Sequence, residues 1–439
     1  MYKVYFLLLT IIIFSININA QKKLSLSEAI SQALNQNTSL KKSVNSLDAT
    51  NEAIKTAYGA LIPTLGINGG FNWSHTSYNS NAASNLTGIP NTPSFGGDSR
   101  NWSLSVGGDV TLFDGLSNFA NIHSKENTYT SAKYDFEKLK QDVVLQTITL
   151  YTAIVSNKKL YDFQAEDLKY NQGLLDKIKQ MYEIKSIAIT DIYSQEATTA
   201  NSELAFMQAE NNYRKSIVNL LNFLAMDVTG DYTFTFENDD LKDTSAVPKE
   251  FNSLFADALN NRQDYQSEKY KVKVSENQVV SSWGGVLPRL SGNYGLSTNA
   301  PVPGDLFSQK TYSVGLSLSI PIFSQFNTEY SIELADVQLK NSNEDLTALE
   351  RQIKTDVMNA YLDLGTNKKQ LDVSRTALAS AKESWEARKE SYTLGALTFL
   401  DQQLAYNNYL QAEYTSITKE YSYIVSQFTV LSVIGALNK

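Results

Sequence analysis

Strict alternation of apolar and small polar residues constrains this chain more than any other feature of its sequence. Residues 288–323 hold two alternating segments separated by a loop. A period of two places successive side chains on opposite faces of a strand. In the second segment one face is Tyr312, Val314, Leu316, Leu318, Ile320 and Ile322, and the other is Ser313, Gly315, Ser317, Ser319 and Pro321. A soluble sheet hides such an apolar face under another element, whereas a lipid-facing strand needs no cover because hydrocarbon supplies it.

The same alternation occurs earlier, in a hairpin predicted over residues 63–113. Its apolar positions are Leu65, Ile67, Phe71 and Trp73, followed by Trp102, Leu104, Val106, Val110 and Leu112. Each strand of roughly 10 to 13 residues is long enough to cross a bilayer at a tilt. Four strands cannot close a barrel, since about eight is the smallest usual number, so several copies of the chain must share one barrel. Asp109 falls on the polar face and is predicted to point into the lumen.

The N-terminus has the pattern of a targeting segment. Lys3 precedes an apolar run that ends near Ile18, and Ala20 follows as a small residue. This predicts a signal peptide over residues 1–20, cleaved after Ala20, with a retained anchor helix as the alternative. No later run approaches the roughly 18 apolar residues of a membrane helix. A secreted chain with barrel strands indicates the Gram-negative outer membrane, with lipid as one partner.

Composition excludes several classes of site. The chain has no cysteine, so disulfides, thiolate catalysis and lipidation at an N-terminal cysteine are excluded. The net charge of −8 does not favour nucleic acid as a partner. His75 and His123 lack a serine and carboxylate context, and no phosphate-binding loop is present. We therefore expect no catalytic residue, no metal site, no cofactor and no enzyme activity.

Two long stretches, 115–247 and 322–439, contain no proline and show helical spacing. They predict long helices over 116–184 and 326–394, each about 100 Å long at 1.5 Å per residue. Shorter helices are predicted over 190–226 and 399–434, and residues 24–62 are also expected to be helical, with a capping box at Ser25 and Glu28. Helices this long suit a projecting coiled bundle rather than a globular core.

The two halves of the chain can be aligned as a direct repeat. Ala33-Leu34-Asn35 matches Ala258-Leu259-Asn260, and Asn157-Lys158-Lys159 matches Asn367-Lys368-Lys369. This predicts an internal duplication with a first repeat over 21–226 and a second over 249–439, whose hairpin is 288–323. A polar segment, 227–248, is predicted to connect them at mid-bundle.

The duplicated helix, proline, hairpin and helix units resemble the TolC-like outer membrane efflux protein family over the whole mature chain. The turn from Tyr392 through Gly395 to Asp401 is similar to the family pattern, whereas the first half has Lys185 where glycine is usual. This departure weakens the inference that the two turns have identical geometry. The resemblance implies a mixed α+β membrane protein, a homotrimer with a shared 12-stranded β-barrel and a long α-helical coiled-coil barrel that extends into the periplasm.

The resemblance also implies a gate at the periplasmic helix tips, an adaptor that docks there, and an inner-membrane pump of the RND or ABC type. By position, Tyr392 matches a gating tyrosine and Asp401 a ring aspartate, while Leu397 and Leu404 replace charged residues of some members. Asp401 as a simple helix cap is the alternative. The gate residues implied are Tyr392, Asp401, Asp191 and Tyr182, and the docking residues are Lys185, Ser186, Ile187, Ala188, Gly395, Ala396, Leu397 and Thr398. A plain solvated turn is the alternative for the second set.

These expectations combine into one function. The chain is predicted to be the outer membrane channel-tunnel of a tripartite efflux or type I secretion system that conducts substrate passively. The alternative is a structural or adhesive coiled-coil protein that carries no solute. The two functions differ in that the channel has a closed lumen and the structural or adhesive protein has none.

Overall fold

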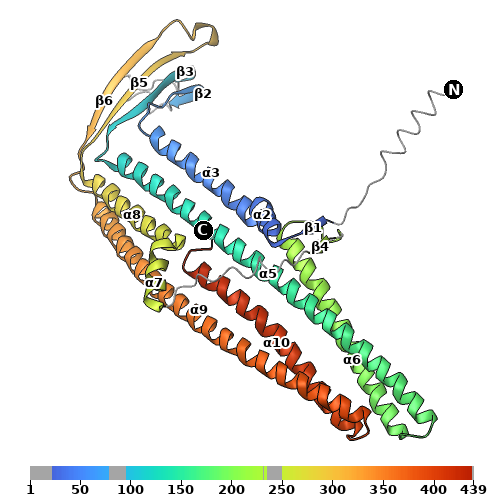
Figure 1. Ribbon diagram of the computed structural model, residues 1–439. Coiled ribbons are helices and arrows are strands. Elements are labelled where there is room, and N and C mark those ends of the chain that lie inside the picture. The colour runs from blue at the N-terminus through green and yellow to red at the C-terminus, as the bar shows by residue number, and fades with distance from the viewer. Residues whose placement is uncertain (1–21, 79–94, 231, 235–249, 438–439) are drawn as a thin grey trace, which may run out of the picture. The chain divides into compact units, whose positions relative to one another are not determined.

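The computed structural model describes residues 22–78, 95–230, 232–234 and 250–437 (Figure 1). The predicted signal peptide with its cleavage after Ala20, much of the first hairpin loop and much of the predicted 227–248 connection lie outside the described residues. Within them, no helix combines the length and the apolarity needed to cross a bilayer. The chain divides into two compact units, one made of 1–44, 135–265 and 349–439, the other of 45–134 and 266–348.

The second unit contains a four-stranded antiparallel sheet in the order β2-β3-β5-β6. Its strands are β2 (Gly66–Tyr78), β3 (Phe95–Phe113), β5 (Arg289–Ala300) and β6 (Thr311–Ser319). The two hairpins predicted from the alternation are joined through β3 and β5, with Gly107 opposite Gly295. Strands β2 and β6 each have a neighbour on one side only, so the sheet ends in two backbone edges.

The apolar face of this sheet is uncovered. Val314 is 89% exposed and Ile322, just beyond β6, is 96% exposed. The other strongly exposed apolar residues of this face are Leu65, Ile67, Phe71, Trp73, Tyr312, Leu316, Leu318 and Ile320. The face is therefore not packed under the chain's own helices, as a soluble sheet would be.

Eight α-helices are described besides the strands, and Figure 1 labels them in chain order. The shorter ones are α2 (Leu26–Gln36), α3 (Thr38–Gly59), α7 (Phe251–Asn261) and α8 (Gln263–Trp283). The long ones are α5 (Ser117–Glu183), α6 (Ile189–Phe223), α9 (Asn327–Thr393) and α10 (Phe399–Val433). Helices α5 and α9 both have 67 residues, and α6 and α10 both have 35. The long helices thus begin and end within three residues of the predicted positions.

The start of the chain differs from the helix predicted over 24–62. Leu24 belongs to strand β1 (Lys22–Leu24), which pairs in parallel with β4 (Tyr232–Phe234). Leu24 and Phe234 are both buried in the core, and Tyr151 Oη donates a hydrogen bond to the Leu24 carbonyl at 3.2 Å. A partner more than 200 residues away therefore determines this conformation, which local spacing cannot show. The capping box at Ser25 and Glu28 is confirmed at the start of α2.

The first unit is held by two apolar clusters on either side of α10. One joins α2, α5, α6 and α10, with Ile154 and Leu220 fully buried; the other joins α7, α9 and α10 around Ile353. Arg262, between α7 and α8, forms ion pairs with Asp264 and with Asp356 of α9. The short helix α7 is thereby attached to a long one by both apolar packing and charge.

The turns that end the long helices have the same backbone geometry, although the first has Lys185 where the second has Gly395. Lys185 has φ +59° and Gly395 has φ +75°. Ser186 N–H donates to the Met181 carbonyl at 2.9 Å, and Ala396 N–H donates to the Ser391 carbonyl at the same distance. Both turns are left-handed helix ends with the 6→1 bond of the Schellman motif. Lysine adopts this conformation at a steric cost that glycine avoids.

We expect Gly395→Ala to loosen the second turn, because a Cβ in the left-handed region costs about 1 kcal/mol. That corresponds to roughly fivefold faster hydrogen exchange of the Ala396 amide, measured on peptides spanning 391–398. Lys185→Gly should slow exchange at Ser186 by less than this factor, because glycine also gains entropy in the open state. If the Ala396 amide in Gly395→Ala exchanges within twofold of its rate in the parent protein, a Cβ at position 395 causes no such strain.

Candidate functional site: the tips of the long helices

Two short loops form the candidate site. Residues 184–188 connect α5 to α6, and residues 394–398 connect α9 to α10. Helices α5 and α6 are held together here by an ion pair between Lys179 and Glu196, with 3.2 Å between nitrogen and oxygen. Helices α9 and α10 are joined by contact of the Tyr392 and Phe399 rings, whose centroids are 6.2 Å apart. Each tip loop therefore connects two helices that contact each other next to it.

The two loops differ at the N-cap residue of the helix that follows, which is Thr398 in one and Ala188 in the other. This difference determines whether Asp401 and Asp191 take part in a capping box. At the start of α10, Thr398 and Asp401 form a capping box in which Thr398 Oγ1 donates to the Asp401 carboxylate at 2.6 Å. At the start of α6 the cap position is Ala188, which has no side-chain oxygen and makes no cap bond. Asp401 is thus committed to its own turn, as the helix-cap alternative predicted, whereas the box cannot form at Asp191.

The pKa values of Asp401 and Tyr392 reflect the different surroundings of the two aspartates. The Thr398 hydroxyl and backbone lower the pKa of Asp401 below its ordinary value. Burial, together with the negative charge of Asp191, raises the pKa of Tyr392. Among the four residues of the predicted gate, the charge of Asp191 acts on Tyr392, whose ring packs against Phe399. Tyr182 is 42% exposed, on the last turn of α5.

The predicted docking residues are only partly accessible. Lys185, Ser186, Ala188, Gly395, Ala396 and Thr398 are exposed. Ile187 and Leu397 are half-buried, and Ile187 packs with Phe399 against a small core of Leu174, Ile178 and Ile192. The docking role of these residues stays a prediction.

Other apolar residues take their place at the surface. Ile184 is 77% exposed, Leu394 is 78% exposed, and Leu400 is 75% exposed. Ile184 and Leu394 each lie one residue before the left-handed residue of their turn. The sequence analysis did not identify Ile184 and Leu394. Their equivalent positions in the two aligned turns were the signal that could have identified them. An exposed isoleucine and leucine at matched places indicate a surface that another molecule covers.

A buried polar network lies behind the tips and was also missed. Tyr406 of α10 donates a hydrogen bond to the Asp167 carboxylate of α5 at 2.7 Å. Asn171 Nδ2 donates to the same carboxylate at 2.9 Å and to Ser202 of α6 at 2.9 Å. Gln195 of α6 donates to Asn171 Oδ1 at 3.1 Å. The network therefore connects three helices through side chains that are nearly inaccessible to solvent.

Aromatic rings surround one end of this network. The Tyr406 ring lies 4.4 Å from that of Tyr170 and 5.3 Å from that of Trp385, and Trp385 stacks on Tyr409 at 5.0 Å. Burial and the negative charge of Asp167 raise the pKa of Tyr406, and burial with Glu413 raises the pKa of Tyr409 to about 12. Both phenols therefore stay protonated at neutral pH, and Tyr406 remains a hydrogen-bond donor to Asp167.

Asp109 lies far along the chain from the tips, on the polar face of β3. Its carboxylate accepts a hydrogen bond from Thr64 Oγ1 at 3.0 Å, and its carbonyl accepts one from Thr64 N–H at 2.8 Å. A Cβ on the neighbouring Gly108 would lie 1.7 Å from the Thr64 carbonyl oxygen, so only glycine permits this approach. Asp109 also lines a cavity of about 820 Å³ together with Arg289 and Ser319.

The described residues contain no group of three or more histidine, cysteine, aspartate or glutamate side chains placed to hold a metal ion. What the tip arrangement offers chemically is hydrogen bonding, charge and apolar contact. These are the means of holding helices together and of binding another protein.

We expect Tyr406→Phe to weaken the junction of α5 and α10, because the Asp167 carboxylate loses its phenolic donor while it stays buried. Such a loss costs about 2 kcal/mol, or roughly thirtyfold faster hydrogen exchange in the α10 peptides around residue 406. Tyr414→Phe, an exposed position of the same helix, is the matched control. Equal exchange in the two variants would show that the phenol–carboxylate bond does not hold the helices.

Sequence comparison identifies relatives over nearly the whole chain. The family described as "Outer membrane efflux protein" matches residues 29–225 and 254–436. "Outer membrane protein TolC" of Salmonella enteritidis is 21% identical over 426 residues, covering 94% of this chain and 82% of that protein.

Two solved structures have the same fold. The CmeC outer membrane channel of Campylobacter jejuni aligns with a TM-score of 0.79 at 18% identity, over 94% of this chain and 86% of that one. The open state of the MtrE outer membrane channel of Neisseria gonorrhoeae aligns with a TM-score of 0.79 at 15% identity, over 94% and 89% of the two chains. With the family match on both halves, these findings establish that the chain belongs to the outer membrane efflux protein family.

Proposed function

We propose that three copies of this chain form an outer membrane channel that conducts substrate passively out of the cell. The observation that carries the proposal is a four-stranded sheet with an uncovered apolar face and two unpaired edges. In hydrocarbon an unpaired edge leaves N–H and C=O groups without partners, at several kcal/mol each. Pairing β6 of one copy with β2 of the next removes every edge, and three copies give twelve strands.

The long helices supply the tunnel of this proposal. The paired lengths of α5 with α9 and of α6 with α10 support an internal duplication, with repeats over 21–226 and 249–439. Three copies contribute twelve long helices of matched length, which suits a closed cylinder that projects into the periplasm. In this arrangement the polar sheet face lines the lumen, and Asp109 lies there as the sequence predicted.

The tips form the gate in this proposal. The influence of the Asp191 charge on Tyr392 supports a contact in the closed state that joins the α9–α10 pair to the α5–α6 pair within one subunit. Separating the pairs opens the aperture like an iris. Tyr182 lies on the neighbouring helix end and completes the aromatic rim. Asp401 faces the axis from its capping box, so three copies form an acidic ring whose charge attracts cations.

The same tips bind the partner. We assign the docking surface to the exposed residues among 185–188 and 395–398 together with Ile184 and Leu394, whose exposed side chains fit the apolar contacts of a periplasmic adaptor. The adaptor connects the channel to an inner-membrane pump of the RND or ABC type, which supplies the energy for transport. No catalytic step is assigned to this chain.

Localisation follows from the same proposal. The segment 1–20 directs secretion and is removed after Ala20, and the absence of cysteine leaves no site for an N-terminal lipid. The mature chain then inserts in the Gram-negative outer membrane by its strands. The competing function, a structural or adhesive protein with a membrane hairpin, predicts no closed lumen and no change in drug sensitivity when the gene is deleted.

Single-channel recording in planar bilayers tests the proposal. Tyr392→Ala and Asp191→Asn each remove one side of the contact between the helix pairs, so we expect resting conductance to rise by about twofold or more. Asp401→Asn should also raise it, because the variant removes the acidic ring and weakens the turn. Asp372→Asn, an exposed acid on α9 away from the tip, should leave conductance unchanged.

Two results contradict this account. Unchanged conductance in the tip variants removes those residues from the gate. Complete absence of conductance in the parent and in every tip variant, from protein shown to be inserted and trimeric, contradicts the channel itself and favours the structural alternative.

A further inference from the structure

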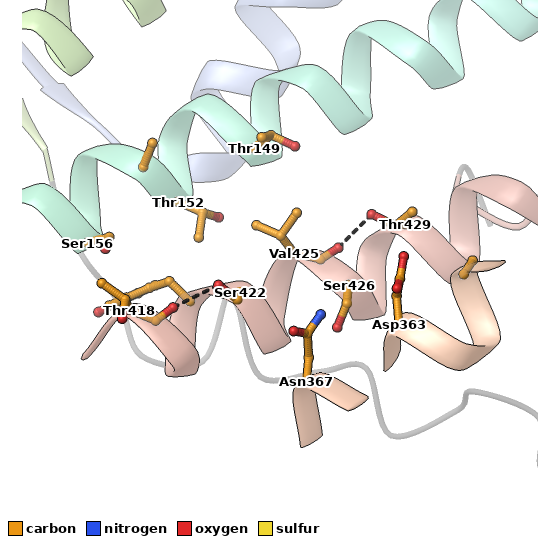
Figure 2. Close-up of a pocket in the computed structure, with 13 residues that line it drawn as sticks. Thr149, Thr152, Ser156, Asp363, Asn367, Thr418, Ser422, Val425, Ser426 and Thr429 are labelled. Carbon is orange, nitrogen blue, oxygen red and sulfur yellow. Dashed lines mark hydrogen bonds between the residues drawn. The ribbon is translucent and has the colours of Figure 1, made fainter. Parts of the chain in front are cut away.

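A groove in the first unit lies between α5, α9 and α10, well away from the tips. Its cavity volume is about 510 Å³, within the range of small-molecule sites in proteins. Figure 2 shows its lining: Thr149, Thr152 and Ser156 come from α5, Asp363 and Asn367 from α9, and Thr418, Ser422, Val425, Ser426 and Thr429 from α10. No lining residue is lysine, arginine or histidine, and Asp363 is the single charge.

The hydroxyl groups of this groove mostly act as acceptors. Five of them donate their own hydrogen to carbonyl oxygens of the same helix, at donor–acceptor distances of 2.7 to 3.1 Å. They are Thr149, Thr418, Ser422, Ser426 and Thr429. Donation into the helix leaves the oxygen lone pairs free to face the groove. With the carboxylate of Asp363, the surface is rich in acceptors and negatively charged. Such a surface suits a ligand that brings N–H donors and a positive charge.

One buried hydroxyl supplies independent evidence for a ligand. Thr152 is 1% exposed, lines the groove, and its Oγ1 has no hydrogen-bond partner within the described residues. Thr147 and Thr149, on the same helix, both bond to the carbonyl four residues earlier. A buried hydroxyl without a partner costs about 1 to 3 kcal/mol. A donor or acceptor placed in the groove next to α5 removes that cost.

The remaining walls define the shape of the ligand. The groove also has apolar surface alongside its hydroxyls, from Ala153, Ala360, Tyr421 and Val425. One carboxylate does not make a metal site, and no cluster of three metal-binding side chains occurs in the described parts of the chain. The groove is also far larger than one ion. An amine with an apolar body fits both the acceptors and the apolar wall.

We propose that this groove is a binding site for organic cations that carry a primary ammonium group. Its place in transport rests on the proposed function, in which the long helices enclose the tunnel and the groove opens toward it. The ammonium group bonds to Asp363 and to the hydroxyl oxygens of α10, while the apolar body lies against Val425 and Tyr421. Cargo of this class would pause here on its way out, held weakly enough to leave.

The test measures binding, independently of conductance. The probe is phenethylammonium, added to the full-length mature protein in lipid nanodiscs and followed by ligand-observed NMR titration. Two probes of similar shape serve as comparisons: the N,N,N-trimethyl derivative keeps the charge but has no N–H donor, and 2-phenylethanol has no charge. We expect saturable binding of phenethylammonium at least fivefold tighter than that of either comparison probe.

Matched variants locate the site. Asp363→Asn should weaken phenethylammonium binding at least fivefold, and Thr152→Val should weaken it about twofold to fivefold. Thr152→Val removes a hydroxyl that has no partner, so the fold should tolerate it. Asp372→Asn, on the same helix but outside the groove, should change the dissociation constant by less than twofold.

Three results overturn the proposal: no saturable binding of the probe, equal affinity for all three probes, or equal affinity in Asp363→Asn and Asp372→Asn. A change in trimer dissociation in Asp363→Asn without any probe binding would assign the groove to contact between subunits instead. If the protein conducts but does not bind the amine, the channel proposal stands and the binding-site proposal fails. If the protein binds the amine at Asp363 but never conducts, the binding-site proposal stands and the channel proposal fails.

Discussion

The need to pair every backbone N–H and C=O group in hydrocarbon is the constraint on which the rest of this structure depends. A four-stranded sheet satisfies its inner strands and leaves the outer sides of β2 and β6 open. Its exposed apolar face, with Val314 and Ile322 almost fully accessible, excludes burial under the chain's own helices. An uncovered apolar face of this kind suits contact with lipid, and in the proposed trimer further copies of the chain close the edges.

In the proposed trimer, the symmetry of the shared barrel applies to the helices as well. Helices that enter a common cylinder must end at the same level, and the equal lengths of α5 and α9 meet that condition. Near the tips, buried hydrogen bonds join the long helices in addition to apolar packing. The buried contacts of Asp167 with Tyr406 and Asn171 join three helices through hydrogen bonds, and a polar network of this kind fixes register where apolar packing alone permits sliding.

Much of the fold could be predicted from the sequence because it follows local periodicity. Period-two alternation located all four strands of the sheet, and the lack of proline located the long helices. Features that depend on distant partners could not be predicted this way. The pairing of β1 with β4 and of β3 with β5 brings together segments that are each ambiguous alone. The left-handed conformation of Lys185 could not be predicted from the sequence, because glycine is the common residue there, yet the helix-end hydrogen bonds impose that conformation on lysine as well.

The candidate site was predictable only in outline. The turn pattern located Tyr392, Asp191 and Asp401, but one threonine-to-alanine difference, between Thr398 and Ala188, determines which aspartate caps a helix. Exposure of Ile184 and Leu394, and burial of Ile187, depend on how each turn folds back on its helix pair, which spacing does not encode.

Lipid accessibility of alternate β6 positions tests the central claim most directly. Because the chain has no cysteine, single cysteines at 313, 314, 316 and 317 can each carry a nitroxide label in protein reconstituted into vesicles. The account predicts that labels at Val314 and Leu316 collide mainly with dissolved oxygen from the bilayer, and labels at Ser313 and Ser317 mainly with a water-soluble nickel complex. Equal accessibility on both faces, or protection of Val314 and Leu316 from both reagents, would contradict it.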